Sequence, residues 1–277
     1  MDKNELENLL NEGFSIGDIA KKYNKSFTAT KYWVNKYGLK SRYNNFKGTA
    51  KGTEIKKFKG NTAKGNSNPD LSHLNYSEWS EEQKQSYSYI LGFYLGDGCL
   101  GHTKKTSRSK TLMITNQASF LNMNKLITDS LQTIFPNKKI KHYYRKNSDC
   151  VNIMVNAISL EELFPHGKGT KHTRKIELKE WQEEICKQYP KELIKGLIES
   201  DGCRFKPVKK YEYIVYQFTN ASKDIHFILQ KFCDLLQIEH TFRKKESKNQ
   251  KRATIYLTCF SKKESVEKLE SFIGKKS

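Results

Sequence analysis

The sequence predicts an α+β protein in which a small helical domain precedes a duplicated unit of helices and strands. The first observation is a repeated stretch, 90–99 and 194–203, in which an apolar helical pattern ends at Asp-Gly. The second is a constant offset, because Asp97 and Asp201 lie 104 residues apart (201 minus 97) and other features repeat at that distance. The third is a run of short helical patterns at the N-terminus.

Residues 1–42 predict three short helices. Three leucines at positions 6, 9 and 10 mark the first helix, and Ser15 and Ser26 are the expected N-caps of the second and third. A tight turn between the last two helices is typical of a helix-turn-helix DNA-binding domain. The third helix, expected over 27–37, would direct these side chains toward DNA: Thr28, Thr30, Lys31 and Asn35. The alternative is a three-helix bundle that binds another protein.

Residues 43–80 lack the aliphatic side chains that a folded core requires. Between 43 and 66 there are six Lys and four Gly, and the stretch 46–52 is echoed at 58–65. An extended Lys/Gly segment can follow the phosphate backbone of DNA. The alternative is a solvated linker, and the composition alone fits both.

Residues 81–277 predict two copies of one order of elements: helix, strand, strand, helix, strand, strand, helix. The strands alternate, since Leu112 and Ile114 face one side while Thr111, Met113 and Thr115 face the other. The same alternation runs over 150–156 and 211–219. An antiparallel sheet with one polar, open face can lie in a DNA major groove and contact base edges.

The two repeated helices are expected to pack against each other. Small residues spaced four apart share one face of each helix: Gly92 and Gly96 in the first, Gly196 and Ser200 in the second. Such packing would bring Asp97 and Asp201 together at the helix ends. Two carboxylates held close together are neutralised by a proton or by a metal ion, so the pair is a candidate functional site.

On this doubled motif and its matched spacing, the chain resembles the LAGLIDADG homing endonucleases of the two-motif, single-chain kind. The resemblance covers roughly residues 81–277, with repeats over 81–188 and 189–277. It implies a pseudo-twofold αββαββα fold with two antiparallel, saddle-like sheets. One position departs from the family pattern: the earlier acidic residue of the motif is Glu199 in the second copy but Leu95 in the first.

The resemblance also implies a metal site. Asp97 and Asp201 would hold divalent metal ions, Mg²⁺ with Mn²⁺ as a substitute, and the preceding residues Gly96 and Ser200 would be further ligands. Carboxylate oxygens suit the hard oxygen preference of Mg²⁺.

Other catalytic residues follow from the same resemblance. Asn116 and Asn220, at the end of the second strand of each repeat, would order water, and turn capping is their structural alternative. A lysine is expected after the last short helix of each repeat. In the first repeat we predict Lys175, with Lys168 and Lys171 as rivals, and in the second repeat the segment 274–276 is a loose match.

The charge of the chain favours a polyanionic partner. Lys+Arg number 50 against 30 Asp+Glu, which gives a formal charge of +20. A basic ribosomal or chromatin protein would explain this charge but not the duplicated Asp-Gly helices. Side chains near strand ends are the predicted DNA contacts, with a solvated charge as the alternative for each: Lys104, Arg108, Lys141, Arg145, Arg204, Lys206, Tyr213, Gln217, Arg243 and Lys244.

The remaining composition indicates an intracellular, DNA-associated protein that is not secreted. No apolar run reaches membrane-spanning length, and the N-terminus lacks the apolar core of a signal peptide. The six scattered cysteines include no C-x-x-C pair and are expected to be reduced thiols.

The resemblance implies a site-specific homing endonuclease that acts as a monomer. It would make a metal-dependent double-strand break in a long, asymmetric DNA target and would belong to a mobile element such as an intron. Two alternatives stay open: a DNA-binding regulator that keeps the scaffold without the chemistry, and a maturase that binds intron RNA.

Overall fold

The computed structural model describes residues 1–12, 14–39, 72–102, 109–207, 213–246 and 253–273. The chain divides into two compact units, Met1–Asn68 and Pro69–Ser277. Most of the expected linker, 43–80, lies outside the described residues, so its role stays a prediction. Among the described residues, no helix has the length and apolar character needed to cross a membrane. The six cysteines, all within the described part, are free thiols.

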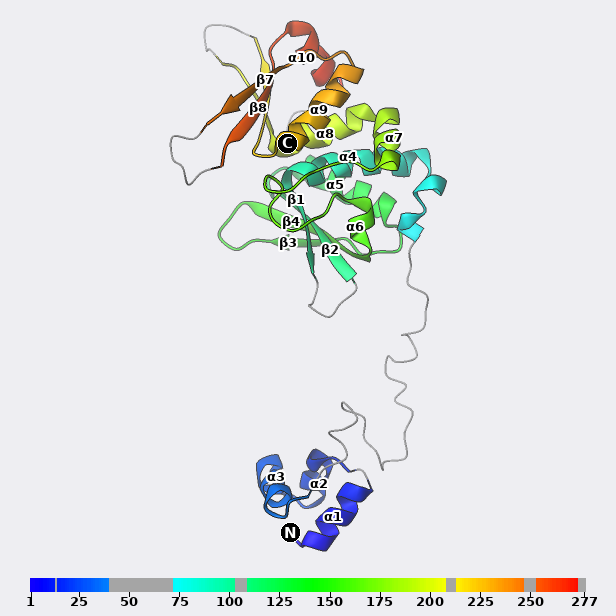
Figure 1. The fold of residues 1–277 in the computed structure, drawn as a ribbon, viewed down its shortest axis with the longest axis vertical. Helices are drawn as coiled ribbons and strands as arrows, with labels where there is room; N and C mark the ends of the chain where they lie inside the picture. The colour runs from blue at the N-terminus through cyan, green and yellow to red at the C-terminus, as the bar shows by residue number, and fades with distance from the viewer. Residues whose placement is uncertain (13, 40–71, 103–108, 208–212, 247–252, 274–277) are drawn as a thin grey trace. The chain divides into compact units, whose positions relative to one another are not determined.

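The N-terminal unit contains the three predicted helices: α1 (Lys3–Asn11), α2 (Ile16–Lys22) and α3 (Phe27–Lys36), drawn in blue in Figure 1. Both predicted N-caps are confirmed, since the Ser15 and Ser26 side chains accept hydrogen bonds from the backbone N–H groups of Asp18 and Ala29. Five apolar side chains form the core of this unit: Leu6, Leu9, Leu10, Ile19 and Val34.

The prediction that Thr30 faces outward is wrong. Its side chain is fully buried, and its hydroxyl donates a hydrogen bond to the Ser26 carbonyl at 3.1 Å. Thr30 lies one helical turn before Val34, so it shares the buried stripe of α3. The local hydrogen bond satisfies the hydroxyl and lets a polar residue occupy a core position.

The larger unit has the predicted duplicated order. The first repeat comprises α4 (Glu81–Asp97), β1 (Gly98–His102), β2 (Ser109–Gln117), α5 (Leu121–Ile134), β3 (Lys141–Tyr144), β4 (Cys150–Ile158) and α6 (Leu160–Leu163). After α7 (Glu180–Gln188), the second repeat comprises α8 (Pro190–Asp201), β5 (Gly202–Phe205), β6 (Val215–Asn220), α9 (Lys223–Leu235), β7 (Thr241–Lys245), β8 (Ile255–Phe260) and α10 (Lys263–Glu270).

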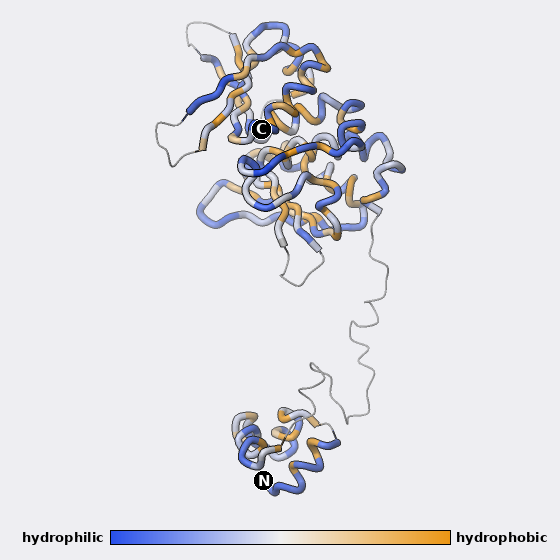
Figure 2. Tube along the Cα trace, in the orientation of Figure 1, coloured by the Kyte–Doolittle hydropathy of each residue, from blue (hydrophilic) through white to orange (hydrophobic). Residues whose placement is uncertain are grey.

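Each repeat forms one antiparallel four-stranded sheet. The strand orders are β1-β2-β4-β3 in the first sheet and β5-β6-β8-β7 in the second, so the same topology occurs twice. Figure 1 shows α4 and α8 between the two sheets. Figure 2 shows hydrophobic segments alternating with hydrophilic ones along both repeats. The predicted alternation is confirmed for Leu112 and Ile114, which share the buried side of β2, and Phe218 of β6 is likewise completely buried.

Helices α4 and α8 pack at backbone distance. A Cβ atom on Gly196 would overlap the Tyr89 carbonyl oxygen and lie 2.8 Å from the Phe93 nitrogen. A Cβ on Gly92 would lie 3.1 Å from the Cα of Gly196 and would overlap the backbone of α8. Glycine is therefore required on both helices at this crossing. The small-residue packing expected from the sequence is confirmed.

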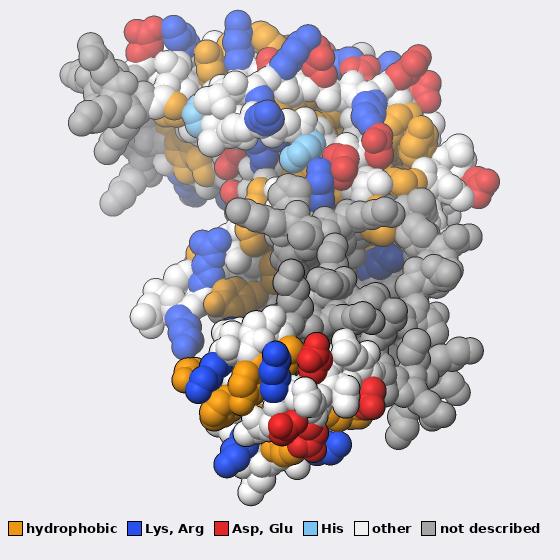
Figure 3. All heavy atoms as spheres, turned by 60° about the horizontal axis from the view of Figure 1, so that its bottom comes forward, with side chains coloured by type: hydrophobic (Ala, Val, Ile, Leu, Met, Phe, Trp, Pro, Cys, Tyr) orange, Lys and Arg blue, Asp and Glu red, His pale blue; other side chains and the backbone are white. Residues whose placement is uncertain are grey.

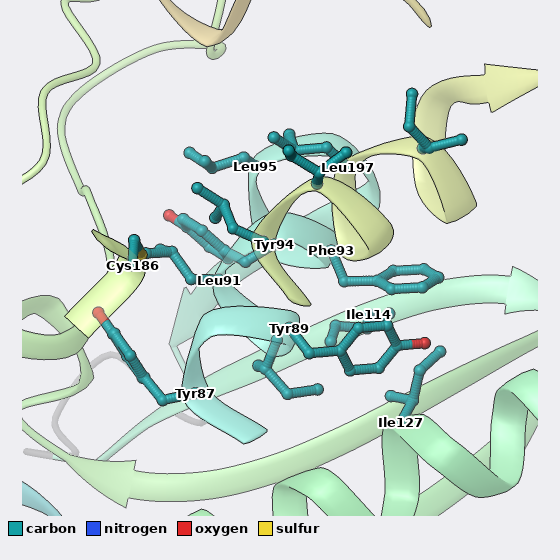
Figure 4. Close-up of a cluster of buried hydrophobic side chains, with 14 of the residues drawn as sticks. Tyr87, Tyr89, Leu91, Phe93, Tyr94, Leu95, Ile114, Ile127, Cys186 and Leu197 are labelled. Carbon is teal, nitrogen blue, oxygen red and sulfur yellow. The ribbon is translucent and has the colours of Figure 1, made fainter. Parts of the chain in front are cut away.

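The second half of α4 is buried on all sides. Figure 4 shows Leu95 beside Leu197 of α8, while Phe93 and Tyr89 extend toward Ile114 of β2. A helix that is apolar all round belongs in the centre of a protein. The Leu95 side chain, which stands where an acidic residue was expected, is completely buried in this core.

The equivalent position of α8 keeps its acid. Glu199 is almost fully buried, and one of its carboxylate oxygens accepts a hydrogen bond from the Tyr89 hydroxyl at 2.7 Å. The acid in this position therefore ties α8 to α4. Burial and the neighbouring Glu199 raise the pKa of Tyr89, which keeps the phenol protonated as the donor.

We expect Gly196→Ala to lower the free energy of unfolding by about 3 kcal/mol, because the added methyl group overlaps backbone atoms that cannot rotate away. Urea denaturation measures this change. Gly101→Ala in β1 is the matched control, since a Cβ there meets nothing within 4 Å. Equal stability of the two variants would contradict the close helix crossing.

Candidate functional site

The helix pair ends at the two motif aspartates. Asp97 is the last residue of α4 and Asp201 is the last residue of α8. Each is followed by a glycine in extended conformation, where a Cβ would overlap the preceding turn: Gly98 against Tyr94, and Gly202 against Ile198. The chain can therefore turn sharply from each helix into the first strand of each sheet.

The crossing of α4 and α8 places the end of α4 against Ser200 and Asp201 of α8. A Cβ on Gly96 would lie 3.2 Å from Oδ2 of Asp201, so the end of α4 touches the carboxylate of α8. Gly96 also lies directly against Ser200, whose hydroxyl donates to the Leu197 carbonyl at 2.9 Å. The negative charges of Asp201 and Asp97 both act to raise the pKa of one nearby side chain, that of Lys171.

Lys171 caps the C-terminus of α4. Its ammonium donates hydrogen bonds to the carbonyl oxygens of Leu95 at 3.1 Å and Gly96 at 2.6 Å, and also to that of Tyr94. Burial lowers the pKa of Lys171 to about 8, and the carboxylates of Asp201 and Asp97 oppose that change. The ammonium is thus charged at pH 7, which suits the negative end of a helix dipole.

The structure does not bring Lys175 to the aspartates. Three-quarters of its side chain is exposed, and it forms an ion pair with Glu177. Lys168 is also exposed. Of the three lysines considered from the sequence, only Lys171 contacts the end of α4. Lys275 and Lys276, considered for the second repeat, lie outside the described residues.

The two predicted asparagines have different partners. The Asn220 amide donates to Oδ2 of Asp201 at 2.6 Å, while its oxygen accepts from the Ser222 backbone N–H at 2.7 Å. Asn220 therefore orients an aspartate and caps a turn at once. Asn116 is buried and its amide donates to Oδ1 of Asn124 at 2.8 Å. The two halves of the site are chemically unequal.

The carboxylate pair fits a divalent cation. Among the described residues, no three or more His, Cys, Asp or Glu side chains gather to hold a metal ion. Asp97 and Asp201 would supply two carboxylates, and Mg²⁺ commonly takes one or two carboxylates while water and phosphate oxygens complete its shell. Of the two further predicted ligands, Gly96 accepts a hydrogen bond from Lys171 at its carbonyl, and the Ser200 hydroxyl donates to the Leu197 carbonyl.

Each sheet has one side covered by helices and one outer face, defined here as the side away from them. In the first sheet, His142 bonds to Thr128 of α5, so its neighbours Lys141 and Tyr143 lie on the outer face. In the second sheet, Phe242 packs on His226 of α9 at 5.5 Å between ring centroids. Arg243 and Lys245 alternate with Phe242 and therefore lie on the outer face.

Two predicted DNA contacts lie on the helix side instead. Arg204 forms an ion pair with Glu270 of α10 at 2.6 Å. Lys244 lies two residues after Phe242, so it is on the same, helix-covered side of β7, and it forms an ion pair with Glu246 at 2.6 Å. Successive side chains of β5 and β7 point to opposite sides of the sheet, and this alternation places Arg204 and Lys244 on the helix side. Lys245 was missed by the sequence analysis, although that alternation could have found it.

The remaining predicted DNA contacts are on the outer face of a sheet, exposed near strand ends, or outside the described residues. Gln217 lies on the outer face of the second sheet. Four others are exposed, on β3 or just beyond a strand end: Lys141, Arg145, Lys206 and Tyr213. Lys104 and Arg108 lie outside the described residues. Over the larger unit, Figure 3 shows Lys and Arg side chains interspersed with Asp and Glu.

Helix α3 presents a mixed polar and aromatic surface. Thr28, Lys31 and Asn35 are exposed as predicted. Two aromatic side chains that the sequence analysis did not select are exposed beside them: Phe27 by 54% and Tyr32 by 58%. Figure 3 shows hydrophobic and basic side chains next to each other on this unit.

No family model matches the chain, and no curated protein is significantly similar to it. Among solved structures, the chain is similar to mesophilic variants of the homing endonuclease I-DmoI, with 15% identity, a TM-score of 0.48 and coverage of 70% of this chain and 98% of that one. I-DmoI in complex with DNA and Mn has 16% identity, a TM-score of 0.47 and the same coverage.

A second group of solved structures comes from DUF199/WhiA. The full-length protein from Thermatoga maritima has 15% identity, a TM-score of 0.45 and coverage of 69% of this chain and 56% of that one. The N-terminal LAGLIDADG domain of DUF199/WhiA has 15% identity, a TM-score of 0.44 and coverage of 74% and 87%. The last of these structures is the one described as a LAGLIDADG domain.

Proposed function

We propose that this chain is a site-specific, metal-dependent DNA endonuclease that cuts both strands of a long, asymmetric target. The observation that carries this proposal is the meeting of Asp97, Asp201 and Lys171 at the ends of two closely packed helices. Carboxylates are unfavourable at a helix C-terminus. Two carboxylates at adjacent helix ends are better explained by cation binding than by a contribution to the stability of the fold.

Hydrolysis of a phosphodiester requires an activated water and stabilisation of the charge that develops on the phosphate. Asp97 and Asp201 would hold the cation, Mg²⁺ or Mn²⁺. When bound, such a cation polarises a phosphoryl oxygen and lowers the pKa of a bound water. Asn220 fixes the orientation of Asp201 through its 2.6 Å hydrogen bond.

Lys171 takes the role that the sequence analysis gave to Lys175. Its ammonium is charged at pH 7 and lies beside both carboxylates, where a cation opposes the negative charge of the reacting phosphate. Lys175 is engaged with Glu177 at the surface. We therefore assign the catalytic lysine of the first repeat to Lys171.

The remaining features support an asymmetric target. One chain supplies two sheets with different outer faces, so the two halves of the target need not be alike and a monomer can serve both. The N-terminal helices, with exposed Thr28, Lys31 and Asn35, would lengthen the contact with DNA. The target is then a single long site on double-stranded DNA.

A non-cleaving DNA-binding regulator is the second candidate. Two observations in the first repeat favour it: Asn116 bonds to Asn124 and Leu95 replaces an acid. A maturase that binds intron RNA is a third candidate function for the same fold. The presence of both motif aspartates favours the nuclease.

We expect Asp97→Asn and Asp201→Asn each to reduce Mg²⁺-dependent cleavage by at least about 10³-fold, since each removes a charged cation ligand. DNA affinity should change little. Cleavage of a randomised duplex library followed by sequencing identifies the target, and gel-shift titration measures binding. Asp129→Asn, which alters an exposed carboxylate on α5, is the control. Tight binding without cleavage by the unaltered chain would favour the regulator.

We expect Lys171→Met to slow cleavage by about 10²-fold and to lower the free energy of unfolding by about 1–3 kcal/mol, because it leaves carbonyls of α4 without their donor. The matched variant Lys175→Met should keep cleavage and change stability by less than about 0.5 kcal/mol. Single-turnover rates and urea titrations measure both. A larger loss of cleavage in Lys175→Met would reverse the assignment.

A further inference from the structure

The outer faces of the two sheets differ in chemistry at equivalent positions. Thr115 and Thr219 are separated by the repeat offset of 104 residues and occupy the same place in β2 and β6. Across the strand pair, Thr115 lies opposite Asn152, whereas Thr219 lies opposite Leu257. A polar partner in the first sheet is thus replaced by an apolar one in the second.

The outer face of the first sheet carries hydrogen-bonding pairs. The Thr115 hydroxyl donates to Oδ1 of Asn152 at 3.0 Å, and the Thr111 hydroxyl donates to Oδ1 of Asn156 at 2.8 Å. Because its oxygen is engaged and its side chain is partly exposed, Asn156 offers its amide N–H donors to a ligand, whereas Asn152 is buried beneath this face. A central methionine pair, Met113 opposite Met154, separates the two polar pairs.

The outer face of the second sheet is apolar along β8. Ile255, Leu257 and Cys259 lie on this face and are partly exposed. The polar side chains of β6 are engaged with near neighbours. Gln217 donates to the Thr219 hydroxyl at 3.1 Å, and its oxygen accepts a weak hydrogen bond from Cys259 at 3.7 Å.

Basic residues flank this apolar strip. Arg243 lies opposite Leu257 and Lys245 lies opposite Ile255, both on the exposed strand β7. Phe205 of β5, 38% exposed, borders the other side. An apolar strip flanked by Arg and Lys side chains is complementary to a polyanion that also exposes apolar groups. In duplex DNA, the apolar group of the major groove is the C5-methyl of thymine.

We propose that the two sheets recognise their half-sites by different chemistry. The second sheet contacts thymine methyl groups through Ile255 and Leu257, while Arg243 and Lys245 contact the adjacent phosphates. The first sheet reads base edges by hydrogen bonds from the partly exposed Asn156, supported by the buried Thr115–Asn152 pair. This inference rests on the proposed DNA-cleaving function, and it assigns the groups that set the specificity of each half-site.

The test replaces thymine by deoxyuridine, which removes the methyl group and keeps the base pair. Substitutions are made in one half of the selected target at a time, and the affinity of the unaltered chain is measured in Ca²⁺-free, Mg²⁺-free buffer. We expect each contacted thymine in the half facing the second sheet to contribute about fourfold in affinity, which corresponds to about 0.8 kcal/mol per methyl group. Deoxyuridine in the other half should change affinity by less than twofold.

Each half is assigned to its sheet by an independent measurement. Ethylation interference with Lys141→Ala and Arg243→Ala shows which phosphates lose their contact, and these residues lie on the outer faces of the first and second sheet. Two further variants exchange the residues that lie opposite Thr219 and Thr115. Leu257→Asn should abolish the deoxyuridine effect at one base pair, whereas Asn152→Leu should leave the effect in the second half unchanged.

The outcomes separate the two proposals. Sequence-specific binding with equal deoxyuridine effects in both halves would overturn the assignment of different chemistries and leave the nuclease proposal standing. A deoxyuridine effect confined to the half that faces the first sheet would overturn it as well. Absence of sequence-specific DNA binding would overturn the proposed function, and this inference with it.

Discussion

The close crossing of α4 and α8 is the constraint on which the structure depends. Gly92 and Gly196 bring the two backbones together, and one turn later Gly96 lies against Ser200 and Asp201. The helices end at Asp97 and Asp201 shortly after this crossing, and the first strand of each sheet begins directly after its aspartate. A bulkier residue at the crossing would separate the helices, and with them the carboxylates and the two sheets.

Local signals made most of the fold predictable. Serine caps and strand alternation predicted the helices and the strand faces, because each depends on neighbouring residues only. The 104-residue offset predicted the duplicated order, because it compares the two copies directly. Lys171 could not be chosen over Lys175 in this way. Both lie in an irregular segment, and only tertiary contact with the α4 carbonyls distinguishes them. The prediction for Thr30 was wrong for a different reason: its hydroxyl bonds to the carbonyl of Ser26 in the preceding turn, which lets a polar side chain occupy a core position.

Duplication within one chain lets the two halves diverge while the scaffold is kept. The helix pair holds Leu95 in one copy and Glu199 in the other, and both are buried at the same interface. Asn220 bonds to Asp201, whereas Asn116 bonds to Asn124. A symmetric homodimer would have to repeat each residue on both sides. The divergence suits a target whose halves differ.

The central claim is that Asp97 and Asp201 form one cation site. Mn²⁺ binding to the DNA-free chain, measured by electron paramagnetic resonance for the unaltered protein, both Asp→Asn variants and the double variant, tests it most directly. A shared site predicts that each single change weakens binding and that the double change costs less than the sum of the two. Losses that add independently would contradict the claim and place the carboxylates in separate sites.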